Sequence, residues 1–258
     1  MRIADVIRRI ESYAPTSLAE SYDNVGLLFG DDMREITSAL LTLDVDIDVA
    51  HEAAEYGANL IVSHHPLIFN PIKTITADSA VGRCLLFLAE NKISVYSAHT
   101  NLDSAEGGLC DLMAAMIGIE NTSPVLPGTG GEGLGRVGLL PDDMTMGELC
   151  DKIIDIYKLR HIRFVGEESD IVRRAALCSG SGMSLTEDVL KADADVYITG
   201  DIKYGAAREA AAMGLNLIEV SHYDSEIFAP LIFERILGDD IKTYISNANR
   251  DIFNMKYR

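Results

Sequence analysis

Histidines follow three short apolar runs of this 258-residue chain. His64 and His65 come directly after the run 60–63, and His99 and His222 come after two further runs. Imidazole nitrogen is a ligand for Zn, Fe, Mn, Co and Ni. One histidine at a strand end is more often an ordinary hydrogen-bonded residue, but three such strand ends together indicate a metal site.

Carboxylates accompany two of these histidines at a spacing of four residues. Asp103 follows His99 and Glu226 follows His222. An i,i+4 pair lies on one face of a helix, so His222 and Glu226 can reach one ion if a helix has begun by His222. Asp103 could instead be a helix N-cap, with Glu106 as its capping-box partner. In the same way, Ser221 with Asp224 could cap the helix that follows them.

The adjacent histidines set a condition on the backbone. Consecutive side chains of a strand point to opposite faces, so His64 and His65 can serve one site only if the chain turns there. Pro66 favours such a turn, because it donates no hydrogen bond and restricts the residue before it. His51 and His161 lack a comparable setting and are not expected to be ligands.

The candidate ligands number five, which is more than one tetrahedral ion needs. They are His64, His65, Asp103, His222 and Glu226. The sequence therefore predicts two divalent cations with a carboxylate between them, of unknown identity among Zn, Fe, Mn, Co and Ni. Two ions about 3.5–4 Å apart can activate a bridging water as a nucleophile.

Alternating strands and helices predict an α/β fold of two interlinked domains, with the dinuclear site in the cleft at the carboxyl ends of the strands. The stretch 121–135, rich in Gly, Pro, Ser and Thr, predicts a boundary between a metal-site domain of residues 1–125 with 222–258 and a second domain of residues 126–221. Residues 50–61 resemble residues 207–218, and each copy leads to a Ser-His pair. This echo arises either by chance or from an internal duplication.

The predicted helices span about 3–13, 48–56, 79–90, 106–116, 146–157, 185–191, 203–213 and 225–236. The predicted strands span about 25–29, 36–43, 59–63, 93–97, 135–140, 161–166, 171–178, 195–199, 216–221 and 241–246.

Composition limits the partners. A formal charge of −18 and a pI near 4.6 argue against nucleic acid as a partner, because proteins that bind nucleic acid gather Lys and Arg on one face. No apolar run approaches the ~18–20 residues that span a membrane. Four scattered cysteines without a C-x-x-C pair predict reduced core thiols, and with the absence of a signal peptide they indicate the cytoplasm.

Glycine turns at 179–182 and 199–201 precede predicted helices and could present N–H groups to an anion, although tight turns need glycine in any case. No phosphate-binding loop of NTPases and no dinucleotide-binding glycine motif is present. The turn that contains Asp23 has no mechanism evident from its spacing.

Five motifs together resemble the NGG-one-interacting-factor-three-like family, also called GTP cyclohydrolase type-two-like or the dinuclear metal-centre family. They are Tyr22-Asp23-Asn24-Val25-Gly26-Leu27, Ser63-His64-His65-Pro66, His99-Thr100-Asn101-Leu102-Asp103, Ile198-Thr199-Gly200-Asp201 and Ser221-His222-Tyr223-Asp224-Ser225-Glu226. The resemblance covers nearly the whole chain, with Tyr22 where the family often has Trp and Ser221 where it often has Gly.

The resemblance implies that the same five residues are the metal ligands, with Glu226 as a bridge. It also implies that His99 acts beside them, so His99 and Glu226 are the expected catalytic residues, and that the chain assembles as a homohexamer. The predicted function is a metal-dependent hydrolase for a small phosphorylated or nucleotide-like substrate. The alternative is a metal-containing ring protein that regulates or docks partners without catalysis.

Overall fold

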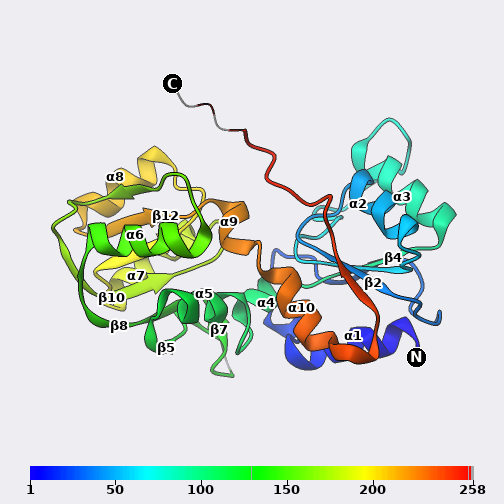
Figure 1. Cartoon of the computed structure of the whole chain (residues 1–258), viewed down its shortest axis with the longest axis horizontal. Helices are drawn as coiled ribbons and strands as arrows, with labels where there is room; N and C mark the ends of the chain where they lie inside the picture. Colours follow the sequence, from blue (N-terminus) through cyan, green and yellow to red (C-terminus); the bar gives the residue numbers. More distant parts are fainter. Residues whose placement is uncertain (129, 255, 257–258) are drawn as a thin grey trace. The chain divides into compact units, whose positions relative to one another are not determined.

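The computed structural model describes residues 1–128, 130–254 and 256. Residue 129 of the stretch 121–135, and residues 255 and 257–258 of the expected range 222–258, lie outside the described residues. The chain forms two compact units (Figure 1). The first takes both ends of the chain, Met1–Leu102 and Phe228–Arg258, and the second is the continuous segment Asp103–Ile227.

The sheet of the first unit is mostly parallel. Its strands, in spatial order, are β1 (Gly26–Phe29), β4 (Ser94–Ser97), β3 (Leu60–Ser63), β2 (Ala39–Thr42) and β13 (Thr243–Ile245). Only β1 runs antiparallel to its neighbour. Every residue of β2, β3 and β4 is buried, as expected for strands covered on both faces.

Helices cover both faces of this sheet (Figure 1). On one face lie α2 (Ile47–Glu55) and α3 (Ala80–Asn91), and on the other α1 (Ile3–Tyr13) and α10 (Ala229–Leu237). Leu40, Ile61, Leu85 and Leu88 belong to the core beneath α2 and α3. Two short 3-10 helices, η1 (Thr16–Leu18) and η3 (Gly238–Asp240), complete this unit.

The sheet of the second unit is mixed. Its strands, in spatial order, are β5 (Glu120–Ser123), β8 (Arg136–Thr145), β10 (Ile171–Leu177), β11 (Val196–Thr199), β12 (Asn216–Glu219) and β9 (Arg163–Val165). The three middle strands β10, β11 and β12 are parallel to one another. A small separate ribbon pairs β6 (Leu126–Pro127) with β7 (Gly133–Leu134).

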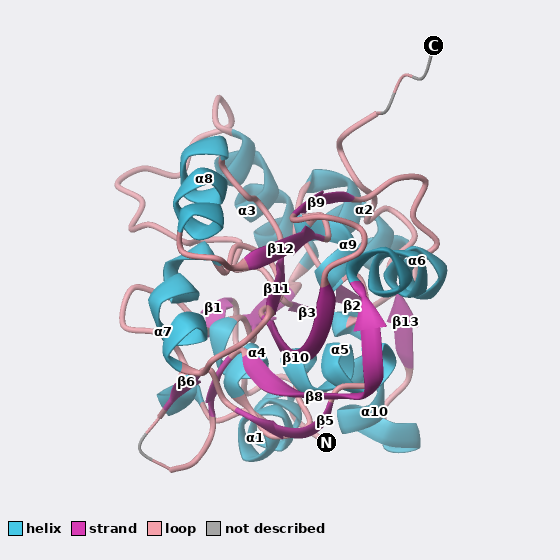
Figure 2. Cartoon of the chain, turned by 90° about the vertical axis from the view of Figure 1, so that its left-hand side faces the viewer, coloured by secondary structure: helices cyan, strands magenta, loops and turns pink. Residues whose placement is uncertain are grey.

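Helices lie on both sides of this second sheet as well (Figure 2). On one side are α5 (Leu109–Ile117) and α6 (Met146–Tyr157), and on the other are η2 (Met183–Leu185) with α7 (Thr186–Lys191) and α8 (Tyr204–Ala212). Two short helices, α4 (Thr100–Ser104) and α9 (His222–Glu226), stand at the changes between units. The α/β fold predicted from the sequence is confirmed.

Two predicted helices differ in the structure. The helix expected over 106–116 begins only at Leu109, as α5, because Gly107 takes a positive φ of 70° just before it; the separate short helix α4 precedes that turn. The helix expected over 225–236 is replaced by α9 and α10, with Pro230 in the first turn of α10. Proline suits that position, where its missing N–H has no helical partner.

The repeated sequence segments adopt the same local structure. Helix α2 leads through Gly57 into β3, and α8 leads through Gly214 into β12. Both glycines have a positive φ, of 67° and 81°, which ends the helix and lets the strand begin. Each strand is followed within three residues by a histidine, His64 in the first unit and His222 in the second.

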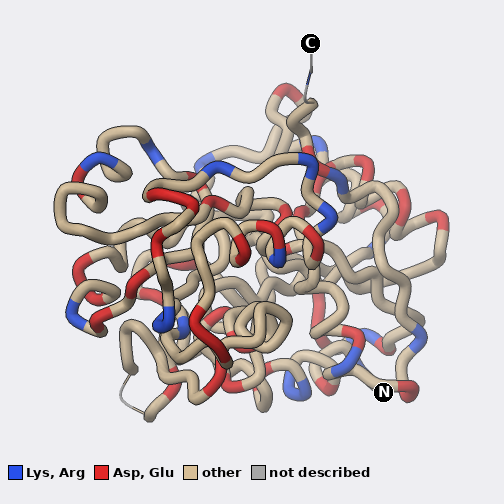
Figure 3. Tube along the Cα trace, turned by 60° about the vertical axis from the view of Figure 1, so that its left-hand side comes forward, with Lys and Arg blue, Asp and Glu red and all other residues tan. Residues whose placement is uncertain are grey.

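Surface and core chemistry follow the composition. Acidic residues occur on many segments of both units and outnumber basic ones, 40 to 22 (Figure 3). The four cysteines are buried and free, as predicted, and burial raises the pKa of Cys84 and Cys150 to about 11. Among the described residues, no helix is long and apolar enough to cross a membrane.

Candidate functional site

The backbone turns directly after β3, as the paired histidines require. The N–H groups of His64 and His65 donate to the end of β2 and the residue after it, to the carbonyls of Thr42 and Leu43 at 3.2 and 2.9 Å. Consecutive donations to one neighbour depart from the alternation of a regular strand. The two rings therefore lie side by side, with centroids 5.3 Å apart.

A third imidazole joins them from the end of β4. The ring centroid of His99 lies 5.2 Å from that of His64 and 5.5 Å from that of His65. Nitrogens of the three rings lie within 4.8 Å of one another, close enough to hold one metal ion. His64 is fully buried, while the side chains of His65 and His99 are 22% and 18% exposed.

Each of these rings is oriented through its Nδ1 atom. The Nδ1 of His64 donates to the Ala98 carbonyl at 2.9 Å, and the Nδ1 of His65 contacts Asp44 at 2.8 Å. The Nδ1 of His99 contacts Asp23 at 2.9 Å. An oxygen acceptor on Nδ1 places the lone pair of a neutral ring on Nε2, the arrangement that metal-binding histidines use.

Asp23 is the most firmly held of these acceptors. Its side chain is fully buried and also accepts hydrogen bonds from the backbone N–H and the hydroxyl of Thr100. Burial alone would raise the pKa of Asp23, but the hydrogen bonds from His99 and Thr100 outweigh it and lower the pKa. The turn whose role could not be read from spacing therefore fixes the ring of His99.

The second unit carries the other predicted residues at the ends of parallel strands. Helix α9 begins at His222, because Ser221 accepts from the Asp224 N–H as the N-cap. His222 and Glu226 therefore lie on one helical face, with Nε2 and Oε2 3.0 Å apart. The Nδ1 of His222 contacts Asp201, which follows β11, at 2.8 Å.

Glu226 is buried beside a glycine that leaves room for it. Gly180 has a φ of 56°, and a Cβ at this position would lie 2.2 Å from Oε1 of Glu226. The N–H groups of Gly180, Gly182 and Gly200 donate to Ser225, Thr199 and the Gly180 carbonyl. These glycines serve close packing, since those three N–H groups have partners within the fold.

Asp103 lies inside α4 and not before a helix, so its interpretation as an N-cap is wrong. It is buried and accepts a hydrogen bond of 2.8 Å from Ser179, the residue before Gly180. The cap of α5 is Gly108. Ser179 and Gly180 thus place Asp103, His222 and Glu226 around one turn of the second unit.

Sequence spacing assigned no role to Asp44, Asp201 or Ser179, although Asp201 and Ser179 lie in turns that it singled out. Asp44 and Asp201 follow the ends of β2 and β11, so the strand-end rule that singled out the histidines would have found them.

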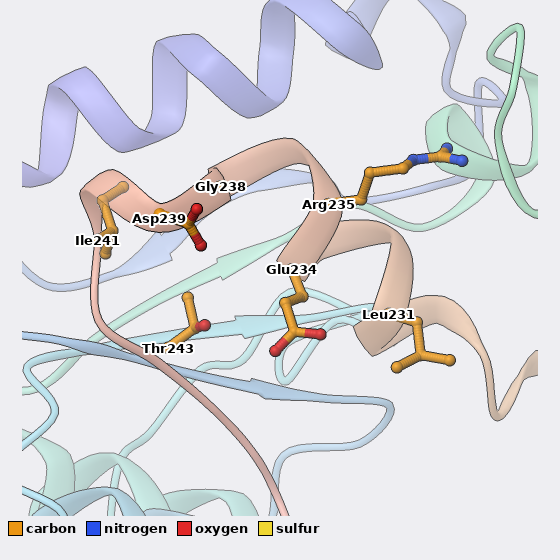
Figure 4. A pocket seen from close by; sticks show the side chains of 7 residues that line it. All are labelled: Leu231, Glu234, Arg235, Gly238, Asp239, Ile241 and Thr243. Carbon is orange, nitrogen blue, oxygen red and sulfur yellow. The ribbon is translucent and has the colours of Figure 1, made fainter.

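A surface hollow of about 540 Å³ lies away from these residues, at the end of α10. Figure 4 shows its lining, which includes Glu234, Arg235 and Asp239 and none of the predicted site residues.

Residues 1–252 match the protein family described as Duf34/NIF3 (NGG1p interacting factor 3). The chain belongs to the Duf34/NIF3 family. It is 37% identical to a Clostridium perfringens protein named GTP cyclohydrolase 1 type 2 homolog, over 98% of this chain and 99% of that protein.

Solved structures agree with this membership. A Staphylococcus aureus hypothetical protein has a TM-score of 0.90 at 30% identity, and a Bacillus cereus protein related to NIF3 has 0.89 at 25%. Each comparison covers 99% of both chains. The family fold therefore extends over the whole chain, and its histidine and glutamate groups could bind a metal ion.

Proposed function

We propose that this Duf34/NIF3 protein is a metal-dependent hydrolase with a dinuclear metal centre, acting on a small phosphorylated or nucleotide-like substrate. The proposed ligands are His64, His65, Asp103, His222 and Glu226. The observation that carries the proposal is the shared orientation of the imidazoles. His64, His65 and His222 each have Nδ1 hydrogen-bonded to an oxygen, which prepares Nε2 as the ligand atom.

The donor set suits such a centre. Imidazole nitrogens and carboxylate oxygens fit Zn, Fe, Mn, Co or Ni, and Glu226 has two oxygens with which to bridge two ions. When bound, two divalent cations supply the Lewis-acid chemistry that makes water a nucleophile at neutral pH. These ligands suit all five metals, and metal analysis of the purified protein identifies the one that is bound.

The chain's own groups would then position the substrate and move protons. His99 is partly exposed beside His64 and His65, and Asp23 holds its Nδ1, so its Nε2 lone pair would take a proton from the attacking water and pass it to the leaving group. Glu226 would act both as a bridging metal ligand and as a catalytic carboxylate. The nucleotide-like substrate rests on relatives named GTP cyclohydrolase 1 type 2 homolog.

The burial of several proposed ligands favours a second candidate, a metal-containing regulatory or docking ring protein. His64, Asp103 and Glu226 are at most 5% exposed. A structural site has all its positions filled by protein, whereas a catalytic site keeps one for water. With either candidate, we propose that the chain assembles as a homohexamer and resides in the cytoplasm.

The test begins with metal analysis of protein purified without chelator. His65→Ala and Glu226→Ala should each lower the bound metal and abolish hydrolysis in a screen of nucleotides and phosphoesters with the native metal restored. His161→Ala, which changes an exposed histidine outside the proposed set, should leave both unchanged. Full hydrolysis by a variant without metal would reject the enzyme mechanism, and metal without hydrolysis would favour the second candidate.

A further inference from the structure

A long exposed loop follows the paired histidines. Between His65 and α3 the chain has neither helix nor strand, and all residues from Phe69 to Ala80 are exposed. Loops longer than about 12–15 residues without secondary structure are uncommon in compact domains, and many of them bind ligands. The loop of this chain starts just after β3, so its first residues lie beside the imidazoles of His64, His65 and His99.

Phe69, near the beginning of the loop, approaches His99. The two ring centroids lie 6.3 Å apart, with the rings inclined at 79°. The Phe69 side chain is nevertheless 42% exposed. Its ring is therefore not required to fill the core, and a large part of its surface faces solvent next to the proposed catalytic imidazole.

A second exposed aromatic residue, Tyr22, lies on the turn that holds the same imidazole. It is 64% exposed and directly precedes Asp23, which binds Nδ1 of His99. The side chain of Asn24 donates to the carbonyl of Ile68, the residue before Phe69. This hydrogen bond ties the turn of Tyr22 to the loop of Phe69, so the two aromatic residues lie on segments anchored to each other and to His99.

We propose that Phe69 and Tyr22 form a ring-binding subsite, which stacks a planar nitrogen heterocycle of the substrate beside His99. A nucleobase has the flat π-face that exposed aromatic rings bind, and such stacking depends little on which base is present. The inference rests on the proposed function for the reaction beside the subsite. It specifies the substrate further, because a sugar phosphate without a ring base would gain nothing from these residues.

The chain contains no tryptophan, which allows a direct test. Phe69→Trp introduces a single indole at the subsite, and its fluorescence is titrated with guanosine 5′-monophosphate, adenosine 5′-monophosphate and ribose 5-phosphate. Both nucleotides should quench the fluorescence saturably, and ribose 5-phosphate should not. Phe253→Trp, at an exposed phenylalanine of the C-terminal segment, is the matched control and should show no saturable quenching.

Alanine substitutions measure the contribution of each ring. Phe69→Ala and Tyr22→Ala should each weaken guanosine 5′-monophosphate binding, measured by calorimetry, roughly 5- to 100-fold, the range for loss of base stacking. Bound metal and the affinity for ribose 5-phosphate should stay unchanged. Unchanged nucleotide affinity in both variants would overturn the subsite, as would altered sedimentation showing that these rings form a contact between copies.

The two proposals can fail separately. Saturable quenching of Phe69→Trp in a protein that hydrolyses none of the screened compounds would retain the subsite and reject the hydrolase. Metal-dependent hydrolysis that is unaffected by Phe69→Ala and Tyr22→Ala would retain the hydrolase and reject the subsite.

Discussion

The histidines of both units are held by acceptors on Nδ1, but the second unit also holds two candidate carboxylates, and it does so by different means. In the first, His64, His65 and His99 are oriented by oxygen acceptors on Nδ1, and the acceptor of His99 is a fully buried carboxylate. In the second, Glu226 lies in the space left by Gly180, and Asp103 accepts from Ser179. Rings held by acceptors should be sensitive to loss of charge, whereas buried carboxylates should be sensitive to added atoms and lost donors.

Gly180→Ala should have the largest effect on stability. The new methyl group meets Oε1 of Glu226, and a φ of 56° is unfavourable for alanine. We expect the free energy of unfolding, measured in urea, to fall by about 3 kcal/mol from strain and overpacking combined. Bound metal should fall as well, because Glu226 must move.

Gly214→Ala separates the effect of backbone strain from the effect of overpacking. Gly214 has a similar φ of 81° in the same unit, but a Cβ there would meet no atom within 4 Å. We expect this variant to lose only about 1–2 kcal/mol, the cost of the backbone conformation, and to keep its metal. Equal losses in the two variants would show that the space beside Glu226 is not what Gly180 provides.

Asp23→Asn should reveal how strongly a buried acceptor fixes an imidazole. The change removes the charged carboxylate that accepts hydrogen bonds from His99 and Thr100. A hydrogen bond to a charged group contributes about 1.5–3 kcal/mol to stability. We expect the free energy of unfolding to fall by about 2 kcal/mol. Asp44→Asn, at a carboxylate 53% exposed beside His65, should cost less than about 0.5 kcal/mol. Similar costs would remove the distinction between the two acceptors.

The contribution of Asp23 to stability should depend on pH. The pKa of Asp23 is lower in the folded protein than in the unfolded chain, so its contribution is complete above the unfolded value of about 3.9. It is lost as the pH falls through the folded pKa. The stability difference between wild type and Asp23→Asn, measured by urea unfolding, should therefore stay constant above about pH 5 and shrink as the pH falls below about pH 4. A difference that stays the same below about pH 4 would contradict the assignment.

Strand and helix positions were largely predictable because periodicity is local. Helix α6 begins at Met146 and ends at Tyr157 as predicted, and β3, β4 and β11 lie within a residue of their predicted bounds. The late start of α5 after Gly107 and the break between α9 and α10, just before Pro230, were missed, since apolar spacing continues across both. A single interruption by glycine or proline changes an element without changing its pattern.

The candidate site was predictable only in its strand-end histidines and the carboxylates four residues after them. The orientation of the His99 ring depends on Asp23, whose partners Thr100 and His99 lie 77 and 76 residues away along the chain. The role of Gly180 likewise depends on Glu226, which approaches it only in the folded chain. Such long-range contacts leave no periodic pattern, so sequence spacing could not reveal them.

Ser179→Ala should lower stability less than Asp23→Asn does, and it tests whether a hydroxyl donor fixes a carboxylate as the acceptors fix the rings. The hydroxyl donates to Asp103 at 2.8 Å in a buried setting, and its loss should cost about 1 kcal/mol in urea unfolding. Because the donor orients a proposed ligand, metal affinity measured by competition with a chelator should fall roughly 10- to 100-fold. Ser181→Ala, at an exposed serine of the same turn, should change neither quantity. A loss of stability with unchanged metal affinity would mean that Ser179 supports the fold alone and that Asp103 does not need this donor to bind metal.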